Sequence, residues 1–438
     1  MYLDPVIVQM PEGVKEDNYV IATYFCATKP STEMIRFAAA LAVEQTTGTW
    51  LTVPGETPEV RERFIGRVVG VYEAPSHQIE VPGDVKERQF IVRIAYPYKN
   101  FGTHFAMMLS TVIGNIASSG KLKLLDLEFP ESFLKEFKGP KFGIQGIRDL
   151  LGVQNRPLLN NMIKPCTGLD AKATARFAYE AALGGVDIIK DDELVADAPH
   201  CPLTERVKYV MEAVHKADAE KGEKTLFSFN ITDRTEKLVD NAHRAIEAGA
   251  NCLMVNYATI GLDATRMLCE DASINVPILA HPDFTGAIYE SPWSGMSASL
   301  ICAKLPRMAG LDMVIALSPY GKFPVMMDTF INCGYHLTAP LRHIKPSFPM
   351  PGGGTTQGHV QELYTMFGKD VMIAAGGAIH GHSMGATAGA KAFRQAIDAV
   401  VAGKKLRDVR NDHKELKAAL DAWGIYGEED KSIFDLKG

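Results

Sequence analysis

The sequence lacks several features that mark other classes of protein. It has seven cysteines in 438 residues, an odd number with no Cys-x-x-Cys pair, so neither a disulfide framework nor a cysteine-based zinc site is predicted. No stretch approaches the roughly 18 consecutive apolar residues of a membrane span, and charged residues stand near the N-terminus where a signal peptide needs an apolar core. We therefore expect a cytoplasmic protein with reduced cysteines and no membrane association.

An excess of basic charge is also missing. Lys and Arg number 46 against 52 Asp and Glu, a net charge of -6, which leaves no overall positive field to attract nucleic acid or anionic lipid. No strand is followed by a Gly-x-Gly-x-x-Gly turn, so we expect chemistry that does not use NAD. The 46% of hydrophobic residues is typical of a globular protein with a sizeable core.

From about residue 158 onward, short apolar runs alternate with longer amphipathic segments. The runs are nearly continuous in apolar residues, which indicates strands covered on both faces and therefore a parallel sheet. Their number predicts a (β/α)8 TIM barrel over 139–438, with a C-terminal helical extension. The eight strands are predicted at 158–165, 185–193, 224–232, 251–258, 276–282, 311–318, 343–351 and 370–377, with helices among them at 171–183, 239–249 and 389–403.

The first 138 residues have a different pattern, in which strands and helices mix without a regular βα repeat. An N-terminal α+β domain of ferredoxin-like type, with one extra strand, is predicted over 1–138. The predicted helices are 31–46, with Ser31 as N-cap, and 103–117; the predicted strands are 18–26, 48–53, 63–74, 88–97 and 121–130.

In a barrel of this kind the active site lies at the C-terminal ends of the strands. Many polar residues and glycines occupy those ends in this sequence, so we expect them to converge on one mouth. They are Lys164, Lys190, Asp191, Asp192, Glu193, Asn230, Asn256, His281, Gly376, Gly377, His380 and His382.

The run Lys190-Asp191-Asp192-Glu193 is the sharpest of these features. Adjacent carboxylates repel one another unless a cation joins them, and Mg2+ prefers such oxygen ligands. Lys190 is either an ion-pair partner or, as a neutral amine, a group that reacts with CO2 to form a carbamate. Taken alone, the tetrapeptide could be a solvent-exposed loop of charged residues. Its position at the end of a predicted barrel strand favours a metal site instead.

Glycines follow the last two predicted strands, at Gly352–Gly354 and Gly376-Gly377. Their exposed backbone N–H groups are typical of a phosphate site in this fold, although glycine pairs also form plain turns. Lys164 is either surface charge or an acid or base at the mouth, and His281 is either a structural or a catalytic histidine.

These residues resemble the ribulose-bisphosphate carboxylase (RuBisCO) large-chain family, and the resemblance covers nearly the whole chain. It implies a carbamylated Lys190 that binds Mg2+ together with Asp192 and Glu193, and an acid/base role for Lys164. The motifs that carry it are GGVDIIKDDE (184–193), MIKPCTGL (162–169), EQTTGTW (44–50), TVIGN (111–115) and AAGGAIHGHSMGATAGA (374–390).

The same resemblance assigns the rest of the site and the assembly. Glu44 and Asn115 would reach into the barrel of a partner subunit, so a homodimer or higher oligomer without a small subunit is implied. One substrate phosphate would be held by Thr49, Trp50, Gly354, Gly376 and Gly377, and Lys322 could be the lysine of a mobile loop.

Departures from the carboxylase pattern narrow the substrate. Cys166 replaces a second lysine, Pro282 replaces an arginine, Gly352 replaces a serine, and the sixth strand lacks a histidine. Because these changes remove the side chains that would bind one of two phosphates, a monophosphorylated substrate is predicted. Such losses are typical of type IV, RuBisCO-like proteins. AHPDFTGAIYESPWSG (280–295) and LSPYGKFP (317–324) further resemble the branch that includes 2,3-diketo-5-methylthiopentyl-1-phosphate enolase.

The resemblance thus implies an Mg2+-dependent enolase or isomerase that forms an enediolate on a monophosphorylated keto sugar, such as a methionine-salvage intermediate. A decarboxylase of a phosphorylated β-keto sugar acid is the first alternative, a true carboxylase the second, and a regulatory binding protein the non-enzymatic one. The enolases carry a lysine base where this chain has Asn115, so either Lys164 or the Lys190 carbamate would take the proton.

Overall fold

The computed structural model describes residues 4–14, 16–48, 51, 53–321 and 323–428. The chain forms two compact units, one of residues 1–138 with 284–301 and one of residues 139–283 with 302–438. The main segment of the first unit ends at residue 138, where the sequence analysis places the end of the N-terminal domain. It also takes in residues 284–301, which the sequence analysis gave to the barrel.

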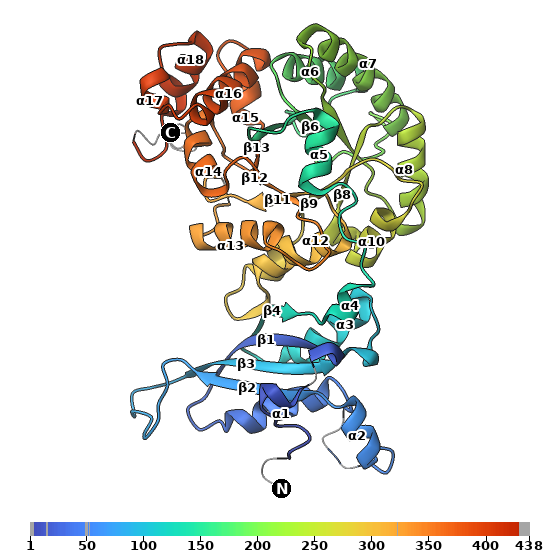
Figure 1. Ribbon diagram of the computed structural model, residues 1–438, viewed down its shortest axis with the longest axis vertical. Helices are drawn as coiled ribbons and strands as arrows, with labels where there is room; N and C mark the ends of the chain where they lie inside the picture. The colour runs from blue at the N-terminus through green and yellow to red at the C-terminus, as the bar shows by residue number, and fades with distance from the viewer. Residues whose placement is uncertain (1–3, 15, 49–50, 52, 322, 429–438) are drawn as a thin grey trace. The chain divides into compact units, whose positions relative to one another are not determined.

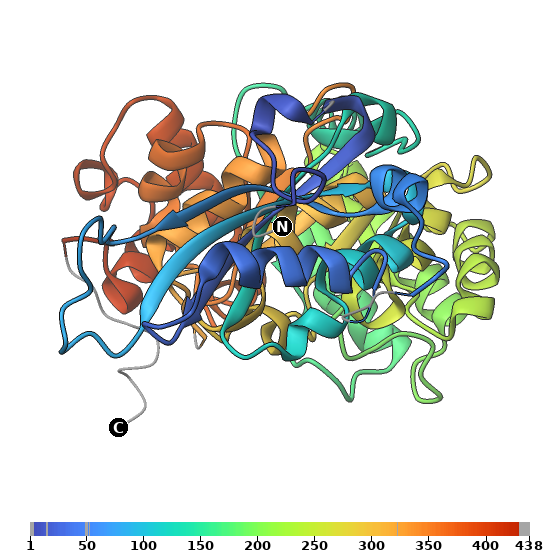
Figure 2. The same cartoon turned by 90° about the horizontal axis from the view of Figure 1, so that it is seen from below.

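The first unit is built on a sheet with the strand order β10-β4-β1-β3-β2. The sheet is antiparallel except for β10, which runs parallel to β4. Figure 1 shows α1 beside β2, and Figure 2 shows the long strands β1 and β3 curving side by side. The strands are β1 (Tyr19–Thr28), β2 (Arg67–Glu73), β3 (Arg88–Pro97), β4 (Leu122–Glu128) and β10 (Ser294–Met296), and the helices are α1 (Met34–Glu44), α2 (Pro58–Phe64), α3 (Phe105–Ile113), α4 (Glu131–Leu134) and α11 (Gly286–Tyr289).

Three details of this unit correct the sequence predictions. Helix α1 follows Glu33, because Thr32 N–H donates to Lys29 O and closes a turn that includes Ser31. The predicted strand 48–53 is wrong for its described residues 48, 51 and 53, and the extra strand is β10 instead. Helix α3 stops at Ile113 because Gly114 has the non-helical ψ of -112.

The second unit is an eight-stranded parallel barrel with the order β12-β11-β9-β8-β7-β6-β5-β13. β12 and β13 lie side by side and close it, and Figure 1 shows helices outside the strands. Each strand lies in a predicted run, apart from the last residue of β12, Gly352, which extends one residue beyond its run, and the predicted barrel is confirmed. The strands are β5 (Leu158–Met162), β6 (Ile188–Lys190), β7 (Leu226–Asn230), β8 (Cys252–Asn256), β9 (Ile278–His281), β11 (Met313–Leu317), β12 (Phe348–Gly352) and β13 (Met372–Ala375).

The barrel helices begin and end with recognisable signals. Helix α6, for example, begins after Asp170, whose side chain accepts a hydrogen bond from Ala173 N–H, and ends before Gly184. The helices are α5 (Gly143–Leu151), α6 (Ala171–Leu183), α7 (Leu203–Lys221), α8 (Leu238–Glu247), α9 (Tyr257–Ile260), α10 (Leu262–Glu270), α12 (Leu305–Ala309), α13 (Met327–Thr338), α14 (Val360–Phe367), α15 (Gly377–His380), α16 (Ala386–Val401), α17 (Leu406–Val409) and α18 (Lys414–Trp423).

Apolar side chains fill the inside of the barrel. Leu158, Ile188, Leu226 and Met350 belong to this core, and α5 adds Ile144 and other apolar residues to it. Since the interior is packed, a ligand reaches the barrel only at its ends, which directs attention to the residues where the strands stop.

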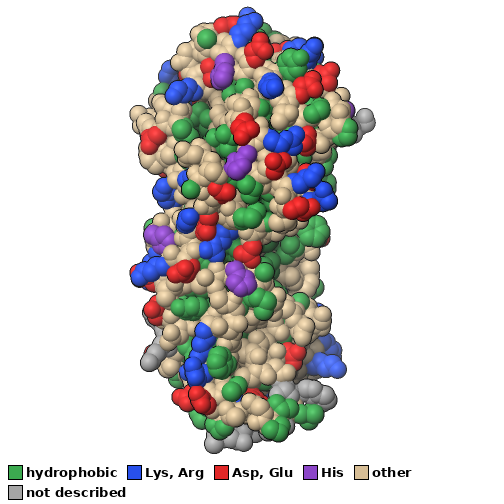
Figure 3. All heavy atoms as spheres, turned by 90° about the vertical axis from the view of Figure 1, so that its right-hand side faces the viewer, with side chains coloured by type: hydrophobic (Ala, Val, Ile, Leu, Met, Phe, Trp, Pro, Cys, Tyr) green, Lys and Arg blue, Asp and Glu red, His purple; other side chains and the backbone are tan. Residues whose placement is uncertain are grey.

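Figure 3 shows how charged side chains are distributed on one face of the molecule. On the face drawn in Figure 3, acidic and basic side chains are interspersed. Within the described part of the chain, no helix combines the length and the apolar character needed to cross a membrane.

A buried histidine makes the stability of this fold depend on pH. The side chain of His359 accepts a hydrogen bond from Thr356 N–H at 3.1 Å, and burial lowers the pKa of His359 to about 4. Because the unfolded chain takes up this proton at higher pH than the folded one, stability present above pH 6.5 is lost as the pH falls toward 4.

We expect this histidine to contribute a loss of about 2 kcal/mol in the free energy of unfolding between pH 7.5 and pH 5. His359→Gln, which keeps an acceptor for Thr356 N–H but does not titrate, should remove that part of the loss. Urea unfolding of both proteins at several pH values measures the difference. Identical pH dependence in the two proteins would contradict the assignment.

Candidate active site

The C-terminal ends of β5, β6 and β9 bring together the charged residues that the sequence singles out. Lys190 ends β6 and His281 ends β9, while Lys164 follows β5 after two residues. β6 pairs with β5 in parallel, with Met162 opposite Lys190, so these ends lie at one mouth.

Lys190 is the central residue of this mouth. Its side chain is fully buried, and its ammonium donates to Glu193 Oε2 at 2.9 Å and to the Asp191 carbonyl at 2.7 Å. Burial opposes ionisation of Glu193, but the nearby charges of Lys190 and His281 outweigh it and lower the pKa of Glu193 to about 2. The site therefore holds Glu193 as a carboxylate throughout the neutral range.

Lys164 makes a second ion pair next to the first. Its ammonium donates to Asp192 Oδ2 at 2.8 Å and to Cys166 Sγ at 2.9 Å. Burial alone would lower the pKa of Lys164, but the hydrogen bonds to Asp192 and Cys166 outweigh it and the pKa is raised. The ammonium form is thus favoured while Asp192 stays in place.

Neighbouring strands fix the position of Glu193. Asn230 and Asn256, the last residues of β7 and β8, donate through Nδ2 to its backbone carbonyl at 3.1 and 3.0 Å. His281 Nε2 lies 3.2 Å from Glu193 Oε2, and His281 Nδ1 lies 3.3 Å from Asp283 Oδ1. Donor atoms of Glu193, His281 and Asp283 all lie within 4.8 Å of one another.

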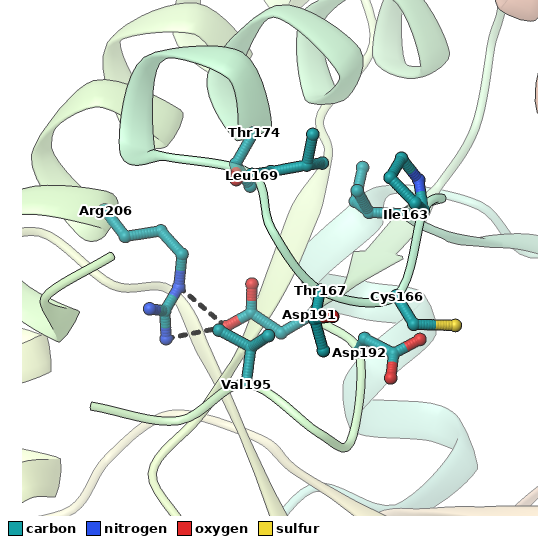
Figure 4. A pocket seen from close by; sticks show the side chains of 10 residues that line it. Ile163, Cys166, Thr167, Leu169, Thr174, Asp191, Asp192, Val195 and Arg206 are labelled. Atoms are coloured by element: carbon teal, nitrogen blue, oxygen red, sulfur yellow. Dashed lines mark hydrogen bonds and ion pairs between the residues drawn. The ribbon is translucent and has the colours of Figure 1, made fainter. Parts of the chain in front are cut away.

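Asp191 faces away from this cluster, although the sequence groups it with its neighbours. It is buried against Arg206, whose Nε lies 3.0 Å from Asp191 Oδ2, and it also accepts from Asn230 N–H at 3.0 Å. Figure 4 shows the Asp191 carboxylate turned toward Arg206 and the Asp192 carboxylate turned away from it. Burial raises the pKa of Asp191, although the Arg206 charge opposes the shift.

The small cavity beside Arg206 does not serve as a substrate pocket. Its lining includes Thr167, Val195 and the Asp191–Arg206 pair (Figure 4), and its volume of about 20 Å³ has room for about one water molecule. A larger hollow of about 510 Å³ lies near Gly152, Arg156 and Gly222. These residues precede β5 and β7, so that hollow lies at the opposite end of the strands from the charged mouth.

The charged cluster fits a hard divalent cation such as Mg2+. Asp192 and Glu193 supply carboxylate oxygens, and both are neutralised here by the ammonium groups of Lys164 and Lys190. A carbamate on Lys190 would replace one of those positive charges with an oxygen ligand beside Glu193. The donor set of three anionic oxygen groups is the kind that Mg2+ prefers.

The glycines lie where the sequence places them, after the last two strands. Gly354 has a φ of +74°, and a Cβ at this position would lie 2.2 Å from the Tyr320 carbonyl oxygen, so no larger residue fits. A Cβ on Gly376 would lie 3.1 Å from the Met162 carbonyl and 3.2 Å from Lys164 Cε. Gly376 therefore borders the lysine, and Gly377 begins α15 next to it.

The remaining predicted residues divide into three groups. Asn115 and Glu44 belong to the first unit, where Asn115 Nδ2 donates to Glu44 Oε1 at 3.3 Å. His382 is buried and pairs with the Glu415 carbonyl at 3.0 Å, which gives it a structural contact. Thr49, Trp50 and Lys322 lie outside the described residues.

The sequence analysis missed two residues at the mouth. Asn161 lies on β5, where its Oδ1 is 3.1 Å from His380 Nε2; burial, helped by the Lys164 charge, lowers the pKa of His380 to about 4. Asp283 contacts the ring of His281. A carboxylate two residues beyond a histidine at a strand end is the signal that could have revealed Asp283.

Comparisons with known proteins agree on one family. Models of the ribulose bisphosphate carboxylase large chain match residues 143–423 with its catalytic domain and residues 11–133 with its N-terminal domain. A ribulose bisphosphate carboxylase-like protein of Archaeoglobus fulgidus is 52% identical over 413 residues, 93% of this chain and 94% of that protein. The 2,3-diketo-5-methylthiopentyl-1-phosphate enolase of Geobacillus kaustophilus is 38% identical over 407 residues, 93% of this chain and 98% of that protein.

Solved structures show the same similarity. A rubisco-like protein (MtnW) from Alicyclobacillus acidocaldarius has a TM-score of 0.86 and 35% identity, over 93% of this chain and all (100%) of that one. The dimeric archaeal Rubisco from Hyperthermus butylicus has a TM-score of 0.85 and 30% identity, over 95% of this chain and 98% of that one.

Because Asp191 and Asp192 point in opposite directions, substitution by asparagine should affect protein stability at one position and Mg2+ affinity at the other. Asp191→Asn leaves the buried Arg206 unpaired, so the free energy of unfolding should fall by about 3–5 kcal/mol. Asp192→Asn should lower it by less, about 1–2 kcal/mol, since the Lys164 side chain is 33% exposed although the Asp192 side chain is only 2% exposed. Mg2+ affinity should fall by about 10-fold or more in Asp192→Asn only.

Urea unfolding and calorimetric Mg2+ titration of both variants, with bicarbonate present, measure these effects. The milder Arg206→Lys variant tests the buried pair if Asp191→Asn does not fold. Equal losses of Mg2+ affinity in the two aspartate variants would contradict the division of roles.

Proposed function

Because this chain belongs to the RuBisCO large-chain family, in its RuBisCO-like branch, we propose that it is an Mg2+-dependent enolase acting on a monophosphorylated keto sugar. A methionine-salvage intermediate of the 2,3-diketo-5-methylthiopentyl 1-phosphate type is the proposed substrate. The similarity to an enolase named for that substrate supports this choice.

The cluster around Lys190 is the observation that carries the proposal. A barrel without catalytic activity that served only as a binding protein would not need to bury a lysine against Glu193 or to pair Lys164 with Asp192. Burying charge costs free energy unless every charge is paired, so four ionised groups gathered at one mouth indicate a site maintained for chemistry.

In this proposal Lys190, as its carbamate, holds Mg2+ together with Asp192 and Glu193. The bound metal would lower the free energy of an enediolate by offsetting its negative charge. Lys164, which borders Gly376, would donate hydrogen bonds to the substrate between its reacting carbons and its phosphate. Gly354, Gly376 and Gly377 would present backbone N–H groups to that phosphate, with Thr49 and Trp50 completing the site.

The missing side chain at Gly352 supports a substrate with a single phosphate. A Cβ on Gly352 would lie 3.5 Å from Ala374 Cβ, 3.8 Å from Ile315 Cγ2 and 3.9 Å from Met162 Cε. These atoms belong to the packed barrel core, so Gly352 offers a second phosphate neither a cation nor a side-chain donor. An uncharged chain such as a methylthioalkyl group needs no such donor.

We further propose that the active enzyme is a cytoplasmic homodimer, or a higher oligomer, without a small subunit. Glu44 and Asn115 would complete the barrel site of the partner subunit. The similarity to a Rubisco described as dimeric, from Hyperthermus butylicus, and to one described as octameric, from Pyrococcus horikoshii, supports such an assembly.

Decarboxylation of a phosphorylated β-keto sugar acid is a second candidate. The hydrogen bond of 3.3 Å between Asn115 and Glu44 favours it, because this pair is kept where the enolases carry a lysine base. A reaction that forms the enediolate by loss of CO2 needs no base to remove a proton from carbon.

The direct test is 31P and 1H NMR of the enzyme with Mg2+, bicarbonate and 2,3-diketo-5-methylthiopentyl 1-phosphate in D2O. We expect conversion, or deuterium uptake next to the carbonyl, and a loss of at least about 100-fold in Lys190→Ala because the third metal ligand is removed. Lys208→Ala, which changes an exposed lysine of α7, is the matched control and should retain activity.

No exchange and no conversion by an enzyme that still binds Mg2+ would overturn the enolase proposal. The β-keto acid phosphate would then be tested for release of CO2. Absence of Mg2+ binding would instead favour the binding-protein alternative.

A further inference from the structure

We infer that Arg63, Arg67 and Lys99 form a binding site for a dianionic phosphate group in the first compact unit. Arg63 lies near the end of α2, Arg67 begins β2, and Lys99 lies in the 3-10 helix Tyr98–Asn100 that follows β3 (Figure 1). The glycines that would hold the substrate phosphate belong to the second unit. The inferred site is therefore an additional one, and it does not depend on the proposed reaction.

The three cations lie close to one another beside one aromatic ring. Lys99 Nζ is 4.6 Å from the centre of the Phe64 ring, and Arg63 Cζ is 5.5 Å from the same centre. Desolvation and the positive charges of Arg63 and Arg67 lower the pKa of Lys99, so both guanidinium groups act on this ammonium. A cation–π contact at an exposed site is weak, so the ring of Phe64 does not offset the repulsion.

Carboxylates compensate little of this positive charge. Within the described part of the chain, the one ion pair of the three cations joins Arg63 to Glu59 at 3.1 Å, and both side chains are largely exposed. Arg67 has neutral acceptors instead, since Nη1 donates to Gln9 Oε1 at 3.0 Å and Nη2 donates to the Glu62 carbonyl at 2.9 Å. Arg67 Nε is buried and has no hydrogen-bond partner among the described residues.

Two other acids beside α2 are already paired. Asp4 and Glu56 both contact Arg61, at 2.6 and 2.7 Å. Neither of them is among the groups that shift the pKa of Lys99. The three cations therefore share the single carboxylate of Glu59, which leaves a surplus of about two positive charges.

The site is partly formed before a ligand arrives. The hydrogen bond from Arg67 to the Glu62 carbonyl ties the start of β2 to the end of α2. Asn100, next to Lys99, donates through Nδ2 to the Phe64 carbonyl at 2.8 Å and ties the 3-10 helix to the same end of α2. A ligand then has to order only the exposed side chains of Arg63 and Lys99, which lowers the entropic cost of binding.

A dianionic phosphate group matches this cluster in charge and in chemistry. A phosphate monoester carries a charge of about -1.5 to -2 at pH 7, which balances the surplus, whereas a carboxylate carries only one negative charge. Arginine and lysine N–H groups donate charge-assisted hydrogen bonds to phosphate oxygens. The ligand is either free phosphate or a small phosphorylated metabolite, since both present the same group.

The alternative is that the three residues are ordinary solvated surface charges. Any salt would then screen them to the same extent at equal ionic strength, because screening depends on ionic strength rather than on the kind of anion. A comparison of phosphate with chloride therefore separates a binding site from a charged surface.

The test measures how fast acetic anhydride acetylates each lysine of the full-length protein in sodium phosphate or in sodium chloride of the same ionic strength. Mass spectrometry of the peptides follows Lys99 separately, and Lys29, an exposed lysine of the same unit, is the internal control. About 20 mM phosphate should slow acetylation of Lys99 by at least about 5-fold relative to chloride, and that of Lys29 by less than about 1.5-fold.

Arg63→Ala should raise the phosphate concentration that gives half of this protection by about 10-fold, because a charge-assisted donor is lost. Arg36→Ala is the matched control and should leave the protection unchanged. Arg36 is 56% exposed and pairs with Glu33, much as Arg63 is 58% exposed and pairs with Glu59.

Equal protection of Lys99 by chloride and phosphate would overturn the inference in favour of plain screening. An unchanged response in Arg63→Ala would overturn it as well. Glycerol 3-phosphate provides a second arm: protection at similar concentrations assigns the site to a phosphorylated metabolite, and protection by inorganic phosphate alone assigns it to the free ion. Since the acetylation of Lys99 is read directly, this result stands even if the proposed enolase reaction fails.

Discussion

The rest of the site depends on the burial of Lys190. A fully buried ammonium is tolerated only when it is paired, and Glu193 makes that pair. Glu193 can turn back onto the strand because Asn230 and Asn256 hold its backbone carbonyl. Thus the ends of β6, β7 and β8 are fixed together around one charge.

The same pairing couples the two cofactors of the proposed function. Reaction of Lys190 with CO2 would exchange a positive charge for a negative one beside the Glu193 carboxylate. Like charges at that distance repel strongly in a buried setting, so the carbamate is stable only if a cation joins them. CO2 and Mg2+ would therefore bind cooperatively, and neither would persist well alone.

Sequence reasoning worked where the signal is local and repeated. The eight strands could be predicted because each lies in a short run rich in apolar residues, and α6 has both its Asp170 N-cap and Gly184 at its end. β10 could not be predicted, since its few residues become a strand only by pairing with the distant β4. Strand alternation separates Asp192 from Asp191 in the sequence, but the partner of Asp191, Arg206, lies 15 residues further on and could not be identified.

The two sides of the mouth determine how a substrate would lie in it. Charged groups gather at the ends of β5, β6 and β9, whereas the surroundings of Gly352 are the methyl groups of Met162, Ile315 and Ala374. Gly376 borders Lys164, so a phosphate held at the glycines places its charged end by that lysine. An uncharged tail would then lie toward Gly352, where no side chain offers a charge or a donor. A substrate with charge at both ends would gain nothing from this division, which agrees with the proposed monophosphorylated substrate.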